Sequence, residues 1–174
     1  MPTEREKNML LLGDSLLEWG DWEVLLPEFQ VVNRGVSGEH VEDLSARLIQ
    51  EIDALPEPDY ILIMSGTNNL VMGNPHFPAI FASMLPRLAD FCPKSSISLN
   101  SIMPMRIQGL AEEKINAVNL ELQTIAQRSG CRFLDMTQPF TEQCLPITKP
   151  CFLNDGVHLD TRGYQIWAKE IRSH

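Results

Sequence analysis

The clearest strand in this sequence reads Asp59-Tyr-Ile-Leu-Ile-Met-Ser65. Its apolar residues follow one another without alternation, which is typical of a strand covered on both faces of a sheet. The stretch Asn8–Gly13 has the same character, and glycine ends it. Two such strands in one chain predict a parallel sheet with helices on both sides, because parallel strands need crossover connections.

Strand and helix patterns alternate through the rest of the chain. The expected strands are residues 8–13, 29–33, 59–65, 96–101 and 131–135, and the expected helices are residues 41–55, 78–91, 110–129 and 161–172. Pro56 and Pro58 end the first of these helices, Gly130 ends the third, and Thr161 lies near the start of the last. This order predicts an α/β fold: a three-layer α/β/α sandwich with a central, mostly parallel five-stranded sheet. We expect one domain over residues 1–174.

Composition excludes several classes of function. The 174 residues carry a net charge of −9, which argues against a nucleic-acid partner and against an anionic membrane surface. No apolar run approaches the roughly 18 residues of a membrane span, and the first residues lack a signal-peptide pattern. We therefore expect a cytoplasmic protein. Its four cysteines lack C-x-x-C spacing, so free thiols are expected, with a Cys144–Cys151 disulfide as the alternative in an oxidising compartment.

Chemistry in such a sheet is expected beyond the carboxyl ends of the strands. The first strand leads into Gly13-Asp-Ser15-Leu, where Ser15 is either a nucleophile or a helix N-cap. The second leads into Asn33-Arg-Gly35-Val-Ser37-Gly, whose glycines let a backbone N–H approach a ligand and whose Ser37 is expected to cap the next helix. The third leads into Gly66-Thr-Asn68-Asn, a polar turn or a donor for an oxyanion.

A fourth polar block precedes the last helix and reads Asn154-Asp155-Gly-Val-His158. Asp155 and His158 are three residues apart, and in a helical turn this spacing puts both on one face. A carboxylate that binds one imidazole nitrogen leaves the other free to take a hydroxyl proton. The block therefore predicts a general base, with a solvated turn as the alternative. The other histidines, His40, His76 and His174, are interpreted as surface or loop residues.

Taken together, the four blocks resemble those of the GDSL esterase/lipase family, also called SGNH hydrolases. The resemblance extends from Met9 to Ile171 and matches Ser15, Gly35, Asn68 and His158 in order. It implies a flavodoxin-like SGNH fold, Ser15 as nucleophile, His158 as general base and Asp155 as its partner. It also implies an oxyanion hole built from the N–H groups of Ser15 and Gly35 and the amide of Asn68, with no cofactor and no metal. The third block departs from the usual Gly-x-Asn-Asp, since residue 69 is Asn.

The resemblance further implies cleavage of small acyl or acetyl esters. Glu18-Trp19-Gly20 and the Gly163-Tyr164 pair look similar to the acetylhydrolase branch, which includes platelet-activating-factor acetylhydrolase and carbohydrate O-acetylesterases. A thioesterase or lysophospholipase, an acyltransferase and a non-catalytic flavodoxin-like binding domain stay open, as does homo-oligomerisation. The expected walls of the acyl pocket are residues 72–78, 104–109 and 139–154; Phe77, Met105 and Phe152 either line it or anchor their loops in a satellite core.

Overall fold

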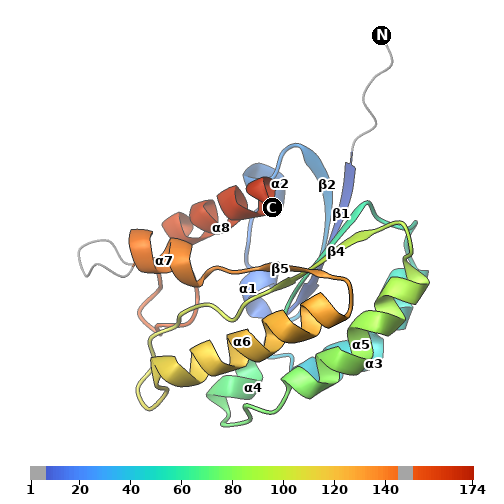
Figure 1. The fold of residues 1–174 in the computed structure, drawn as a ribbon. Helices are drawn as coiled ribbons and strands as arrows, with labels where there is room; N and C mark the ends of the chain where they lie inside the picture. Colours follow the sequence, from blue (N-terminus) through green and yellow to red (C-terminus); the bar gives the residue numbers. More distant parts are fainter. Residues whose placement is uncertain (1–6, 145–150) are drawn as a thin grey trace.

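The computed structural model describes residues 7–144 and 151–174. Its sheet has the strand order β2-β1-β3-β4-β5, and every adjacent pair is parallel (Figure 1). The five strands are β1 Lys7–Gly13, β2 Phe29–Gly35, β3 Tyr60–Met64, β4 Ser96–Asn100 and β5 Arg132–Leu134. The predicted α/β class with a five-stranded parallel sheet is confirmed.

The long helices lie where the sequence predicts them. They are α3 Val41–Asp53, α5 Pro78–Phe91, α6 Glu112–Arg128 and α8 Thr161–Ser173. Asp160 rather than Thr161 is the N-cap of α8, and its carboxylate accepts a hydrogen bond from the N–H of Gly163. Four short helices lie outside the prediction: α1 Ser15–Glu18, α2 Trp22–Leu25, α4 Thr67–Val71 and α7 Thr137–Gln143. Four to seven residues are too few to show a helical period.

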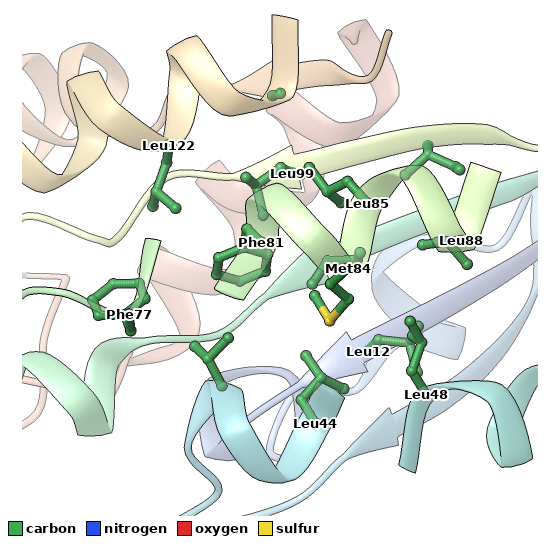
Figure 2. Packing of buried hydrophobic residues seen from close by; sticks show 14 of the residues in the cluster. Leu12, Leu44, Leu48, Phe77, Phe81, Met84, Leu85, Leu88, Leu99 and Leu122 are labelled. Carbon is green, nitrogen blue, oxygen red and sulfur yellow. The ribbon is translucent and has the colours of Figure 1, made fainter. Parts of the chain in front are cut away.

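Alternate residues of β1 divide between two buried layers. Leu10 and Leu12 pack with α3, α5 and α6, and we call this cluster the aliphatic layer. Figure 2 shows side chains of this layer, with leucines of α3 below α5 and Leu99 of β4 above it. Met9 and Leu11 pack on the opposite face with α2, α7 and α8. Both faces of the sheet are therefore covered, as the uninterrupted apolar strands predict.

The second layer is rich in aromatic residues. Trp22 meets Trp167 edge to face, with ring centroids 5.0 Å apart, and the indole N–H of Trp167 donates to Asn100 Oδ1 at 2.8 Å. The Tyr164 hydroxyl donates to the carbonyl oxygen of Leu16 at 2.8 Å. This last bond fastens α8 to α1, so the final helix helps to hold the turn that carries Ser15.

The cysteines correct one prediction. Cys144, at the end of α7, forms a disulfide with Cys151, with their Cα atoms 5.2 Å apart. Free thiols were the wrong expectation for this pair, because the fold brings both residues into the buried cluster around Phe140. Cys92 and Cys131 are free thiols, as expected. Residues 145–150, part of the predicted pocket wall 139–154, lie outside the described residues, as do residues 1–6. Among the helices described, none is long and apolar enough to cross a membrane.

Candidate active site

Three side chains from distant parts of the chain form a hydrogen-bonded row at the carboxyl edge of the sheet. Ser15 Oγ lies 2.9 Å from His158 Nε2, and His158 Nδ1 lies 2.6 Å from Asp155 Oδ2. Ser15 is the second residue after β1 and is 8% exposed, so a ligand can still reach it. With Nδ1–H donating to the carboxylate, Nε2 has a lone pair for the serine hydroxyl proton. The predicted Ser15, His158 and Asp155 are thus brought together.

The turn that carries Asp155 and His158 is not helical, which corrects the basis on which they were paired. An antiparallel bridge between Phe152 and Leu159 closes the turn, and the N–H groups of Val157 and His158 both donate to Asp155 Oδ1 at 2.9 Å. Gly156 has φ +72°, and a Cβ atom there would lie 2.1 Å from the carbonyl oxygen of Arg106. Only glycine fits this position, and it lets the Asp155 carboxylate turn back toward the imidazole.

The sequence at the end of β1 explains how Ser15 is presented. Asp14, not Ser15, is the N-cap of α1, and its Oδ1 accepts a hydrogen bond from the Leu16 N–H at 3.0 Å. Ser15 is therefore the first helical residue, and its own N–H has no hydrogen-bond partner among the described residues. The amide is free to donate to a ligand, so the N-cap alternative for Ser15 is wrong.

Asn68 approaches the same edge from the start of α4. Its side-chain amide donates one hydrogen to the carbonyl oxygen of Glu39 at 2.8 Å, which leaves the second amide hydrogen for a ligand. The neighbouring Asn69 is buried; its Oδ1 accepts from the Val41 N–H at 2.9 Å and its Nδ2 donates to Glu42 Oε2 at 2.7 Å. Asn69 thus fastens α4 to the start of α3 and holds Asn68 in place.

The predicted role of Gly35 conflicts with its surroundings. The Gly35 N–H donates to Asn33 Oδ1 at 3.0 Å, and a Cβ atom at Gly35 would lie 2.4 Å from the backbone nitrogen of Glu18. Glycine is therefore required here because β2 packs closely on α1, and its N–H is already bonded. By contrast, the N–H of Gly38 has no partner within residues 7–144 and 151–174.

The loop between β2 and α3 borders the site, and both neighbours of Gly38 in this loop are held by hydrogen bonds or ion pairs. Ser37 accepts a hydrogen bond from the Trp19 indole N–H at 3.2 Å and donates to the Glu18 carboxylate, so its expected helix-capping role is wrong; His40 is the N-cap of α3. On the other side, the carboxylate of Glu39 is buried and pairs with the Arg47 guanidinium. The Glu39–Arg47 pair fixes the carbonyl group that binds Asn68.

Trp19 contacts His158, and the sequence does not predict this contact. Its indole stacks on the imidazole of His158, with ring centroids 3.9 Å apart and planes 15° apart. The two residues are far apart in sequence, and the sequence signals are the position of Trp19 four residues after Ser15 and its place in Glu18-Trp19-Gly20. The remaining histidines are outside this row: His40 caps a helix, His76 is exposed, and His174 is half-buried at the end of α8.

Two carboxyl groups near Ser15 have pKa values shifted in opposite directions. Complete burial raises the pKa of Asp14 to about 7, although the Leu16 N–H and His158 favour its ionised form. Burial also acts to raise the pKa of Asp155. Hydrogen bonds from the His158 ring and from two backbone N–H groups outweigh it and hold the pKa of Asp155 below its usual value. Asp155 is therefore the carboxylate that stays ionised beside the imidazole at neutral pH.

Two of the predicted pocket walls face each other across a cavity of about 220 Å³. Gly73 and Pro75 line it from residues 72–78, and Ile107 lines it from residues 104–109. Ser15 and His158 are not among the described residues that line this cavity. Phe77 and Met105 do not line an open slot, because both are buried in the aliphatic layer, against which Phe152 also packs. They anchor their loops in the main core rather than in a separate satellite cluster.

A hydrogen-bonded Ser–His–Asp row at the carboxyl edge of a parallel α/β sheet is the arrangement of a serine hydrolase. The family model for the GDSL-like lipase/acylhydrolase family matches residues 11–166, and the chain belongs to this family of carboxylic ester hydrolases. The resemblance stated from the sequence blocks is confirmed.

Solved structures share the fold. A GDSL-like lipase from Bacteroides thetaiotaomicron is 24% identical with a TM-score of 0.73, covering 99% of this chain and 89% of that one. A mutant of an acetyl-xylooligosaccharide esterase from Geobacillus is 22% identical with a TM-score of 0.78, covering 96% and 93%. An acetyl xylan esterase is 18% identical with a TM-score of 0.78, covering 95% and 98%. Such identities show the fold alone, and no curated protein matches the sequence.

Proposed function

We propose that the protein hydrolyses small acyl esters through an acyl-serine intermediate formed on Ser15. The observation that carries the proposal is the row of two short hydrogen bonds, 2.9 Å and 2.6 Å, from Ser15 through His158 to Asp155. The matching family and two acetylxylan esterases among the similar structures support ester hydrolysis and an acetyl group. In this proposal residues 1–174 act as one hydrolase domain.

The chemistry proceeds in two steps. Ser15 Oγ attacks the ester carbonyl carbon while His158 Nε2 takes the hydroxyl proton; the proton then passes to the departing alkoxide as the C–O bond breaks. Water next attacks the acyl carbon, His158 accepts its proton, and Ser15 leaves with that proton restored. Asp155 stays ionised throughout and stabilises the imidazolium. The residues need no metal or organic cofactor for either step.

For the oxyanion we propose three donors: the N–H of Ser15, the second amide hydrogen of Asn68 and the N–H of Gly38. Gly38 replaces the predicted Gly35, because the Gly35 N–H already donates to Asn33. Gly38 lies between Ser37, which binds Trp19, and Glu39, whose carbonyl oxygen binds Asn68. Each such donor typically contributes roughly 2.7–4 kcal/mol to transition-state stabilisation.

The experiment that tests the function is hydrolysis of p-nitrophenyl acetate by Ser15→Ala. We expect kcat to fall by a factor on the order of 10⁵–10⁶, because removal of the nucleophile removes the acyl-enzyme route. The matched control is Ser83→Ala, which changes an exposed serine on α5 whose hydroxyl bonds only to its own helix. A fluorophosphonate probe should label Ser15 alone. Hydrolysis by Ser15→Ala at the wild-type rate would exclude the assignment.

The same assay separates the alternatives. A nitrophenyl series of increasing acyl length distinguishes an acetyl esterase from a lysophospholipase, and a thioester substrate tests the thioesterase. Product analysis with a sugar acceptor in excess distinguishes hydrolysis from acyl transfer, since both pass through acyl-Ser15. A cytoplasmic location stays a prediction, and the Cys144–Cys151 disulfide counts against it because such bonds persist in oxidising compartments.

A further inference from the structure

The imidazole of His158 has a partner on its ring face as well as at both nitrogens. Trp19 covers that face with its indole nearly parallel, at a centroid distance of 3.9 Å. The two nitrogens are fixed by Ser15 and Asp155, but two in-line hydrogen bonds do not by themselves fix the tilt of the ring about the line that joins them. A flat surface against the ring fixes that remaining freedom.

The indole is held in place although 52% of Trp19 is exposed. Its N–H donates to Ser37 Oγ at 3.2 Å, and the Ser37 hydroxyl in turn donates to the Glu18 carboxylate. An exposed tryptophan without such a restraint would sample several side-chain rotamers. Trp19 belongs to neither buried layer, so this restraint does not serve the packing of the core.

We propose that Trp19 is a positioning residue for His158, which holds the imidazole plane between Ser15 and Asp155 and stabilises the imidazolium that forms during catalysis. The proposal rests on the proposed function for its kinetic consequences. An indole face attracts a cation, and indole is the most effective ring for this interaction. The interaction strengthens when the imidazole becomes charged, so it favours the transition state over the ground state.

The surrounding charges define what a pH experiment would measure. Asp155 bonds to the imidazole directly, and the Asp14 carboxyl lies close enough to interact with it electrostatically. Glu18 lies on α1 beside Trp19 and is bound to Ser37, and the backbone of Arg106 packs on the turn at Gly156. Substitution of Trp19 leaves all four groups in the protein, so a shift in the pH profile reports the lost ring.

The test compares Trp19→Phe with Trp19→Leu in p-nitrophenyl acetate hydrolysis. Leucine keeps an apolar side chain over the imidazole but has no aromatic face. Phenylalanine keeps an aromatic face, which attracts a cation less strongly than indole does. We expect kcat to decrease from wild type to Trp19→Phe to Trp19→Leu, by about two- to fivefold in total, with KM little changed. The acid limb of the kcat profile should move to lower pH in the same order, by about half a unit, because the charged imidazole loses its partner.

The control is Phe91→Leu, which removes another half-exposed aromatic ring, at the far end of α5. This variant should keep the kcat and the acid limb of the wild type. If Trp19→Leu also keeps both, the proposal is overturned. It is equally overturned if Trp19→Leu and Trp19→Phe lose the same activity with no movement of the acid limb, because loss of apolar cover or of fold would then explain the result.

A second measurement does not depend on catalysis. A protonated imidazole in contact with an indole quenches indole fluorescence, so the emission of the wild type should fall on acidification. Trp19→Phe and His158→Asn should each abolish this change. If the change is present but no ester is cleaved, the contact stands and the proposed function fails. If ester is cleaved but the change is absent or survives in Trp19→Phe, the positioning role fails and the function stands.

Discussion

The aliphatic layer and the carboxyl edge of the sheet bury side chains of opposite kinds. The layer is built from fully buried residues that need no hydrogen bond, including Leu48, Leu88 and Leu122 (Figure 2). The edge, at the ends of β1 and β3, buries the polar side chains of Asp14, Ser65, Thr67 and Asn69. Among the described residues, Asp14 Oδ2, Ser65 Oγ and Thr67 Oγ1 have no hydrogen-bond partner.

This difference separates stability from chemistry within one sheet. Burial of apolar area stabilises the layer by roughly 25 cal/mol per Å², whereas a buried polar atom without a partner costs about 1–3 kcal/mol. The layer must therefore offset what the edge costs. The edge in return holds the proposed nucleophile, the proposed base and free N–H groups in one place, where an apolar edge would offer none.

The largest expected effect on stability comes from Leu88→Ala, which should leave activity unchanged. Leu88 is fully buried near the end of α5, and this helix runs antiparallel to the strands, so Leu88 lies far from the carboxyl edge. We expect the free energy of unfolding in urea to fall by about 2.7–5 kcal/mol, while kcat of the folded enzyme stays within about twofold.

Leu120→Ala is the matched control, because Leu120 is 65% exposed on α6. It should change the free energy of unfolding by less than about 0.5 kcal/mol. A large loss of kcat in folded Leu88→Ala would show that layer and edge are coupled, contrary to the separation drawn above.

The second prediction concerns Asp14 and tests how much its burial at the carboxyl edge lowers the free energy of unfolding. The folded carboxyl titrates at a pKa of about 7 because of burial, against 3.8 for the unfolded chain. Between these values the folded protein holds one more proton than the unfolded chain, so this group makes the free energy of unfolding fall as pH rises from about 4 to about 7. The total loss is on the order of 4 kcal/mol.

Asp14→Asn should remove this loss. Asparagine keeps the oxygen that caps α1, and its amide can donate toward the Thr67 hydroxyl beside it. The difference in unfolding free energy between Asp14→Asn and the wild type should therefore grow with pH up to about 7 and then level off. Asp160→Asn, at the N-cap of α8, is the control. A difference that does not change with pH would contradict a titrating Asp14.

Much of the fold follows from pattern, and the exceptions have physical causes. The helical spacing of Val41, Leu44, Leu48, Ile52 and Leu55 predicts a buried stripe, and the first four are buried on α3. Leu55 lies beyond the end of α3 and is only partly buried, whereas α5 has the predicted bounds. The short helices depend on caps and tertiary bonds rather than on period, so no pattern reveals them. The disulfide depends on the approach of Cys144 to Cys151, which the spacing of the cysteines alone does not determine.

The site shows the same division. Ser15 and Asn68 were predictable as neighbours because they follow β1 and β3, whose carboxyl ends must share an edge. Asp155 and His158 precede α8 instead, and their spacing and the family resemblance pointed to them, although Ser15 and His158 are 143 residues apart. Which backbone N–H remains free was not predictable, since Gly35 and Gly38 differ only in what their amides meet in three dimensions. The Trp19–His158 stack was hidden for the same reason, because it joins two elements with no shared pattern.

The smallest effect concerns Asn69, the residue that departs from the usual Gly-x-Asn-Asp block. Asn69 Nδ2 donates to Glu42 Oε2 at 2.7 Å, so an aspartate here would place one carboxylate against another. We expect Asn69→Asp to lower the free energy of unfolding by about 1 kcal/mol, limited by the freedom of exposed Glu42 to turn away. Because α4 also carries Asn68, we expect kcat to fall in Asn69→Asp as well.

The double variant Asn69→Asp with Glu42→Gln should recover most of both losses, because glutamine can donate to the new carboxylate as Asn69 now donates to Glu42. Urea unfolding of the four proteins gives the coupling energy, for which we expect more than 0.5 kcal/mol, as is typical of residues in direct contact. Additive effects would mean that the bond between residues 42 and 69 does not hold the edge. A coupling of the expected size would mean that asparagine at position 69 and glutamate at position 42 form one unit, so that the departure from the family pattern is matched by its partner.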